Sequence, residues 1–151
     1  MKKMTYRFLT ICSNGERMEG LLADALRKNG QEVYSYSDVV ETMISADNIP
    51  KDSKFYRSVI DEVRPDVICV SELLVEYLLH SRRLSGFVEQ LGTQIPVVFR
   101  GFDDAYEKEI FDIIDHPNKH FITDDKGIRK WADDLLRYLD DNSLVPRPAI
   151  N

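Results

Sequence analysis

The residues best suited to chemistry follow an apolar run at residues 95–99, where Arg100, Gly101, Asp103 and Asp104 occur close together. Paired carboxylates can bind a cation or act as a general acid and base. An arginine can hold a phosphate or a carboxylate through two parallel hydrogen bonds. The acidic pair is also typical of a helix start, where it faces the positive end of the helix dipole. We expect a helix cap, with Arg100 bridged to Asp103 or Asp104, and keep ligand binding as the alternative.

Small or polar residues also follow the other apolar runs, at Ser13, Asn14, Gly15, Ser71, Glu72 and Thr123. An Asn-Gly turn that opens a helix can hold an anion on its free N–H groups, but such a turn is more typical of a simple cap. The glycine-rich phosphate loops of nucleotide-binding proteins do not occur in the sequence.

The histidines and cysteines do not have the spacing of a metal site. His80, His116 and His120 are scattered along the chain, without the pattern of metal ligands. Cys12 and Cys69 lie in apolar runs, which favours buried thiols over a disulfide framework or a zinc site. We therefore predict no metal and no cofactor, and reduced thiols favour a cytoplasmic location.

Composition limits the class of protein. The chain has 151 residues, 43% of them apolar and 30% charged, with a net charge of −6, as is typical of one globular domain. The acidic balance argues against binding to nucleic acid, and no run approaches the roughly 18 apolar residues that span a membrane. We expect one domain at residues 1–140 and a tail at residues 141–151.

Hydrophobic periodicity places the elements that must position these residues. Short apolar runs predict strands at residues 6–12, 31–36, 66–70, 95–99 and 120–123. Amphipathic segments predict helices at residues 16–28, from Asp38, from Ser53 to before Pro65, at 73–91 with a pause at Ser85-Gly86, at 105–114 and at 127–139. Trp131 lies on the apolar side of the last helix, so we expect it in the core.

The alternation of strands and helices predicts a doubly wound α/β domain. We expect a flavodoxin-like three-layer sandwich with a five-stranded parallel sheet in the order 2-1-3-4-5, numbered along the chain. Ligands of such folds bind at the carboxyl ends of the strands. The polar residues that follow the apolar runs are therefore expected at one edge of the sheet.

Four segments carry a resemblance to a known family: LTICSN before the first helix, RPDVICVS at the third strand, QIPVVFRGFDD at the fourth and HFITDD at the fifth. Over roughly residues 5–140, the chain resembles a response-regulator receiver domain. A working receiver carries an acidic pair, an aspartate, a Ser or Thr and a Lys at the ends of its first, third, fourth and fifth strands. The positions that match are Ser13 and Asn14, then Ser71, then Arg100 or Gly101, and then Thr123.

Every one of these functional residues is replaced. Receiver phosphorylation needs Mg²⁺ held by carboxylates, so the resemblance implies a pseudo-receiver that is not phosphorylated. Such a chain would be a signalling or protein-interaction module of a two-component system and not an enzyme. Its protein partner would bind the fifth strand and the flanking helices. Phe121 matches the aromatic position that changes rotamer in the family.

A second resemblance is to cobalamin-binding domains of the same architecture. The segment from Gly15 to Gly20 matches the family's first motif, and Ser71-Glu72-Leu73 and Arg100-Gly101 match the next two. Arg17 replaces the histidine that ligates cobalt, which leaves a small-ligand sensor as the alternative function. Its possible ligand-binding residues are Gly15, Gly20, Ser71, Leu73, Asp103 and Asp104.

A third and weaker resemblance is to the N-terminal half of a two-domain glycosyltransferase, through PDVICVSELL and IPVVFRGFD. That resemblance implies that a second, nucleotide-sugar-binding half would be needed for activity.

Overall fold

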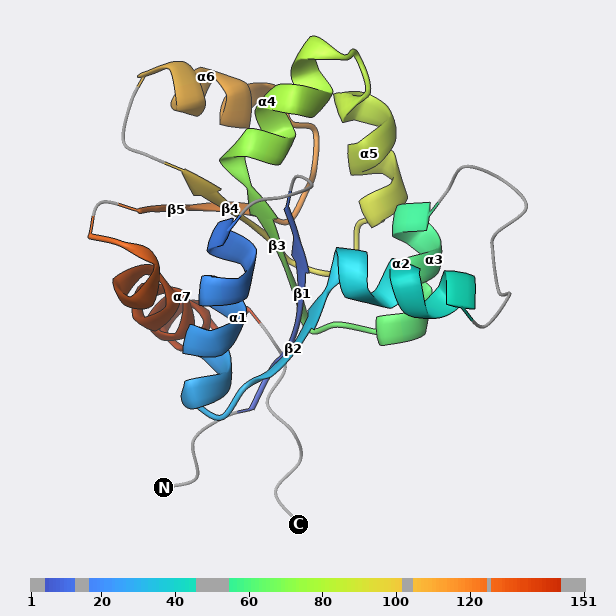
Figure 1. The fold of residues 1–151 in the computed structure, drawn as a ribbon. Coiled ribbons are helices and arrows are strands. Elements are labelled where there is room, and N and C mark those ends of the chain that lie inside the picture. The colour runs from blue at the N-terminus through green and yellow to red at the C-terminus, as the bar shows by residue number, and fades with distance from the viewer. Residues whose placement is uncertain (1–4, 13–16, 46–54, 102–104, 125, 145–151) are drawn as a thin grey trace.

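The computed structural model describes residues 5–12, 17–45, 55–101, 105–124 and 126–144 (Figure 1). Its strands form one parallel sheet in the order β2-β1-β3-β4-β5. They are β1 (Arg7–Ile11), β2 (Glu32–Ser35), β3 (Val67–Ser71), β4 (Val97–Gly101) and β5 (Lys119–Thr123). The predicted fold class and strand order are both confirmed.

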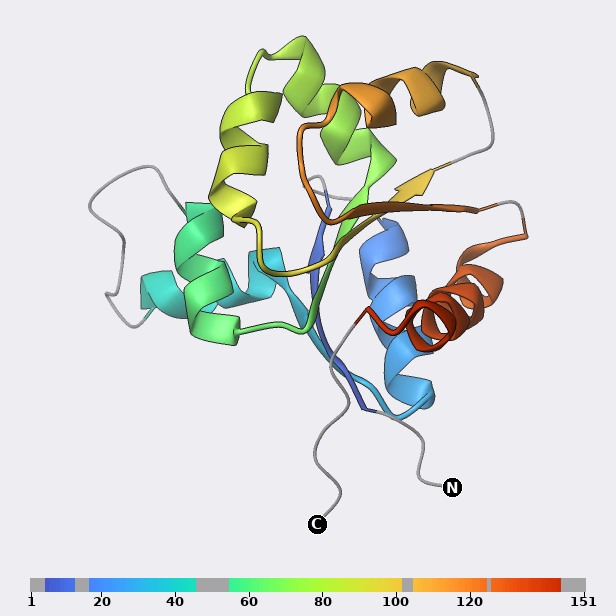
Figure 2. The same cartoon turned by 180° about the vertical axis from the view of Figure 1, so that it is seen from behind.

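Helices cover both faces of the sheet. They are α1 (Arg17–Lys28), α2 (Tyr36–Ser45), α3 (Phe55–Val63), α4 (Glu72–His80), α5 (Leu84–Leu91), α6 (Ala105–Ile113) and α7 (Ile128–Asn142). Figures 1 and 2 show α1 and α7 on one face, and α2 to α6 on the other. This arrangement is the predicted three-layer sandwich.

Alternating side chains of the strands build two separate cores. Phe8 packs in the core beneath α1 and α7, whereas its neighbour Leu9 packs in the core beneath the other helices. Every residue of β3 and β4 is buried, as expected of parallel strands that are covered on both faces. Trp131 is 1% exposed and its Nε1–H donates to the carbonyl of Ile122 at 2.9 Å, which confirms its place in the core.

The edge strand β2 is covered by an arginine of α1. In a parallel ladder, alternate residues of an edge strand point their backbone groups away from the sheet. Arg27 donates from Nη2 to the carbonyl of Val33 at 3.0 Å. One outward-facing acceptor of β2 is therefore already bonded within the chain.

The segment expected as one helix at residues 73–91 forms two helices. The break lies between α4 and α5, at residues 81–83, and not at the expected Ser85-Gly86. Arg82 has a φ of 61°, and the N–H of Arg83 donates to the carbonyl of Leu78 at 2.8 Å. Leu78 and Leu84 are six residues apart, which would place them on different sides of one straight helix. The break lets both be buried.

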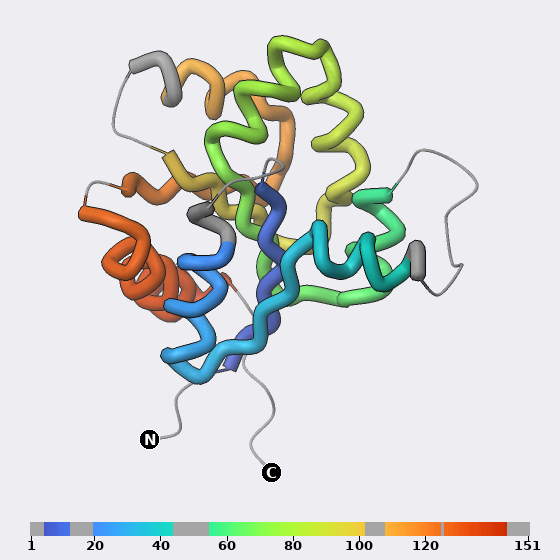
Figure 3. The backbone as a smooth tube through the Cα atoms, in the orientation of Figure 1, coloured from blue at the N-terminus to red at the C-terminus, as the bar shows by residue number. Residues whose placement is uncertain are grey.

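Several other boundaries differ by a few residues. The chain enters α2 directly from β2 (Figure 3), because Ser35 rather than Asp38 acts as the cap: its Oγ accepts the N–H of Asp38 at 3.3 Å. The last helix continues beyond residue 140 to Asn142 and ends at Ser143, whose φ is 50°. Leu144 packs against the core beneath α7, so the first residues of the expected tail belong to the folded unit.

Cys69 is buried and Cys12 is partly buried, and neither is in a disulfide. Burial raises the pKa of the Cys69 thiol far above its usual range, which keeps the thiol protonated and unreactive. Within the described ranges, no helix is long and apolar enough to cross a membrane.

His116 lies just before β5, and its ring connects two turns of the chain through hydrogen bonds. It is 5% exposed, and its Nδ1 accepts the N–H of Asn118 at 3.0 Å. Its Nε2 therefore carries the proton and donates to the carbonyl of Gly92 at 2.7 Å. Burial lowers the pKa of His116, against a smaller opposing effect of the Gly92 carbonyl and Asp115. The neutral ring is the one that holds both turns.

This geometry predicts a loss of stability in mild acid. Below the ordinary histidine pKa of about 6.5, the unfolded chain takes up a proton before folded His116 does, so the free energy of unfolding falls as the pH drops. We expect His116→Gln to be less stable than the wild type near pH 7.5 and to lose less stability between about pH 7.5 and about pH 5.5. Urea unfolding at both pH values measures this.

The matched control is His80→Gln, because His80 is exposed. It should keep the wild-type dependence on pH. The pKa of His120 is lowered by burial and, to a smaller extent, by His116. Removing His116 therefore also lessens the shift at His120, which reduces the pH dependence in the same direction. An equal pH dependence in the wild type and His116→Gln would contradict the assignment.

Candidate functional site

The carboxyl ends of three neighbouring strands bring the expected polar residues together. Ser71 of β3 lies beside Arg100 of β4, and Gly101 of β4 lies beside Thr123 of β5. The strands extend beyond the expected apolar runs because this backbone pairing continues through Ser71, Arg100 and Gly101. The predicted site residues of β3, β4 and β5 thus share one edge of the sheet.

Arg100 forms a buried ion-pair cluster at this edge. Its Nη2 lies 3.4 Å from Oε1 and 3.3 Å from Oε2 of Glu72. Its Nη1 lies 3.3 Å from Oδ2 of Asp124. The side chains of Arg100, Glu72 and Asp124 are only 6%, 13% and 6% exposed. Because little water reaches these side chains, each charge needs its oppositely charged partner to offset the free-energy cost of its burial.

The expected bridge from Arg100 to Asp103 or Asp104 stays a prediction beside these two described partners. Asp103 and Asp104 themselves lie outside the described residues, as do Ser13, Asn14 and Gly15. Glu72 was one of the residues expected at this edge, but as a partner of Arg100 it was not foreseen. Asp124 was missed entirely, although it is the first aspartate of the HFITDD segment.

Local backbone structure positions both carboxylates. Ser71 ends β3 and caps α4, and its Oγ accepts the N–H of Leu74 at 3.3 Å. Glu72 is consequently the first residue of α4, where the helix dipole favours an acidic side chain. Asp124 follows β5. Its N–H donates to the carbonyl of Gly101 at 2.7 Å, and its Oδ1 accepts the N–H of Gly127 at 3.1 Å.

Cavities beside the cluster are small where the structure describes their lining. Two cavities adjoin Arg100 among the described residues, with volumes of about 20 Å³ beside Glu72 and Phe121 and about 10 Å³ beside Ser71 and Trp131. A single water needs about 10–15 Å³. The same residues contain no group of three His, Cys, Asp or Glu side chains that could hold a metal ion.

Three of the residues expected for a small ligand lie within the described ranges, in different surroundings. Ser71 is buried, whereas Leu73 is 49% exposed on α4. Gly20 lies on α1, and a Cβ built on it would meet no atom within 4 Å. Gly15, Asp103 and Asp104 lie outside the described residues, so the small-ligand alternative stays a prediction.

Phe121 is half-buried on β5 beside the cluster. Its ring lies 5.5 Å from the ring of Phe111 on α6, and the Nζ of Lys119 lies 4.6 Å from the centre of the Phe111 ring. These contacts link the edge strand β5 to α6.

Comparison with solved structures bears on the fold. NtrX from Brucella abortus in complex with ADP superposes with a TM-score of 0.54 over 93% of this chain, at 14% identity. NtrX in complex with ATP gives 0.52, again over 93% of this chain, at 15% identity. The response regulator PhyR from Brucella abortus gives 0.48, over 94% of this chain and 51% of that one, at 12% identity.

The chain has the fold of a response-regulator receiver domain. It spans 28% of the NtrX chain in both complexes. No protein-family model matches the sequence, and no curated protein matches it. At these identities the likeness concerns the receiver fold alone.

The buried ion-pair cluster of Arg100 leads to a prediction about stability. Replacing Arg100 with Met leaves two buried carboxylates without their cation, so the free energy of unfolding should fall by about 3–5 kcal/mol. The triple variant Glu72→Gln/Arg100→Met/Asp124→Asn should recover part of that loss because it leaves no uncompensated charge. Urea unfolding followed by fluorescence of the single tryptophan measures both.

Arg57→Met is the matched control. Its ion pair with Asp61 is 51% and 62% exposed, so its loss should cost less than about 1 kcal/mol. Equal losses in the free energy of unfolding for Arg100→Met and Arg57→Met would contradict the prediction that the buried cluster stabilises the fold more than an exposed ion pair does.

Proposed function

We propose that this receiver-fold chain is a signalling module that works through protein contacts and is not phosphorylated. The observation that carries the proposal is the position of the Arg100 guanidinium between Glu72 and Asp124 at the strand edge. On this proposal the chain is a pseudo-receiver and not an enzyme.

The chemistry of phosphoryl transfer supports this proposal. Transfer to a carboxylate requires Mg²⁺, held by carboxylate oxygens, to neutralise the phosphoryl charge. At this edge, the described carboxylates of Glu72 and Asp124 already pair with the guanidinium of Arg100, a residue of β4. A metal ion would have to displace the guanidinium, which would leave a buried charge unpaired. Ser71, at the matched acceptor position, uses its hydroxyl to cap α4.

The partner surface on this proposal is β5 with its flanking helices α6 and α7. β5 is an edge strand, and four of its five residues are partly exposed. The net charge of −6 favours a protein partner over nucleic acid. A cytoplasmic location remains part of the proposal.

Phosphorylation is tested directly with acetyl phosphate and Mg²⁺. We expect no added phosphoryl mass on the intact protein. With beryllofluoride and Mg²⁺, we expect no NMR shift of the Ser71, Arg100 and Asp124 amides, because Arg100 occupies the charge site. A phosphorylatable receiver domain treated in parallel is the positive control. A phosphoryl adduct on this chain would overturn the proposal.

The partner surface is tested by co-purification of the tagged full chain from its native host. Arg137 is exposed on α7, so Arg137→Glu should weaken recovery of the specific partner without unfolding the chain. Arg57→Glu, on α3, should leave recovery unchanged. If both variants recover the partner as the wild type does, the assignment of the β5 surface to this contact is wrong.

A further inference from the structure

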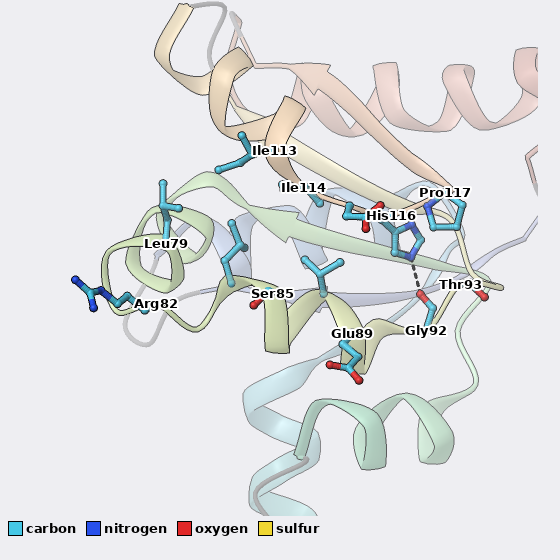
Figure 4. Close-up of a pocket in the computed structure, with 13 residues that line it drawn as sticks. Leu79, Arg82, Ser85, Glu89, Gly92, Thr93, Ile113, Ile114, His116 and Pro117 are labelled. Carbon is cyan, nitrogen blue, oxygen red and sulfur yellow. Dashed lines mark hydrogen bonds between the residues drawn. The ribbon is translucent and has the colours of Figure 1, made fainter.

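An open groove lies between α5 and the chain that leaves α6 for β5 (Figure 4). Its volume is about 650 Å³, far larger than the cavities beside Arg100. It involves neither Ser71 nor the ion-pair cluster. It is therefore a different surface from the strand edge discussed above.

One face of α5 forms a wall of the groove along its whole length. Ser85, Val88 and Glu89 line it, with the spacing of residues that share one side of a helix, and Gly92 lines it just beyond the end of α5. The eight residues of α5 extend over about 12 Å. The groove is consequently long enough to contact about two turns of another helix.

The middle of the groove is apolar. Leu79 and Val88 line it from α4 and α5, and Ile113 lines it from the end of α6. Ile113 is 61% exposed, the highest value among the large apolar side chains that the structure describes as exposed. An exposed apolar side chain set in a groove with a polar rim marks an interaction site more often than an isolated one does.

The two ends of the groove have opposite charge. Arg82 lies at one end, at the turn between α4 and α5, whereas Glu89 lies toward the other, as does His116, which directly follows the lining residue Asp115 (Figure 4). A helix carries partial positive charge at its N-terminus and partial negative charge at its C-terminus. A helix in this groove would match both ends if it ran antiparallel to α5.

The backbone of the groove favours a helix over an extended peptide. A bound strand gains most of its affinity from backbone hydrogen bonds to a sheet edge. Here the walls are helices, and the carbonyl of Gly92 already accepts the Nε2–H of His116 at 2.7 Å (Figure 4). A helix needs no such partners, because its backbone groups are bonded internally.

We propose that this groove binds an amphipathic helix of a partner protein. The apolar face of that helix packs on Leu79, Val88 and Ile113. Its N-terminus lies toward Glu89 and Asp115, and its C-terminus lies toward Arg82. The inference rests on the proposed function in that both rely on protein contacts, but it uses a surface separate from β5 and α7.

The test uses a phage-displayed library of 16-residue helix-forming peptides with one randomised face, selected on the full chain. Selected peptides should carry apolar residues at helical spacing. Their affinity should fall about tenfold or more for Ile113→Glu, as for a buried contact residue. Leu21→Glu is the matched control, because Leu21 is also exposed, at 48%, but lies on α1. It should change the affinity by less than about twofold.

Orientation is measured with a spin label at the N-terminus of the strongest peptide. Amide signals near Glu89 should broaden more strongly than those near Arg82. Failure to select any peptide, binding that Ile113→Glu does not weaken, or a small molecule bound in place of helices would each overturn the proposal. None of these results depends on phosphorylation or on Arg137, so the proposed function is tested independently.

Discussion

The structure of the strand edge depends on the buried ion pairs of the Arg100 guanidinium. Arg100 joins three pieces of chain: the start of α4 through Glu72, β4 through its own backbone, and the turn into α7 through Asp124. Since Asp124 also accepts the N–H of Gly127, the same carboxylate fixes the turn that leads into α7. Charges that are largely removed from water tolerate little displacement. The edge is therefore held in one arrangement by electrostatics as well as by the sheet.

This arrangement separates the receiver fold from receiver chemistry. In a working receiver the strand edge is an acidic site that a metal ion enters and leaves. Here the positive charge is covalently part of the chain. Any signal would have to pass through surfaces that other proteins touch, because the interior of the edge is occupied. The β5 surface with α6 and α7, and the groove beside α5, which Ile113 of α6 also lines, are the two surfaces proposed for such contacts.

The fold was predictable because its signals are local and repeated. Apolar runs such as residues 66–70 specify covered parallel strands, and their alternation with helices specifies a doubly wound α/β domain. The break at residues 81–83 required a different argument, since only the spacing of Leu78 and Leu84 reveals it. The ion-pair cluster was not predictable in the same way. Its members come from three strand ends, and their side-chain pairing depends on geometry that periodicity does not encode. Asp124 also falls outside the positions where a receiver keeps its functional groups.

The contact between Arg27 and the carbonyl of Val33 has a consequence beyond the single molecule. Exposed sheet edges are templates on which further chains can add strands, and proteins commonly block them with charged side chains. By occupying an outward acceptor of β2, Arg27 opposes growth of the sheet from one copy into the next. The domain can then reach high local concentration without its β2 edge nucleating fibrous assembly.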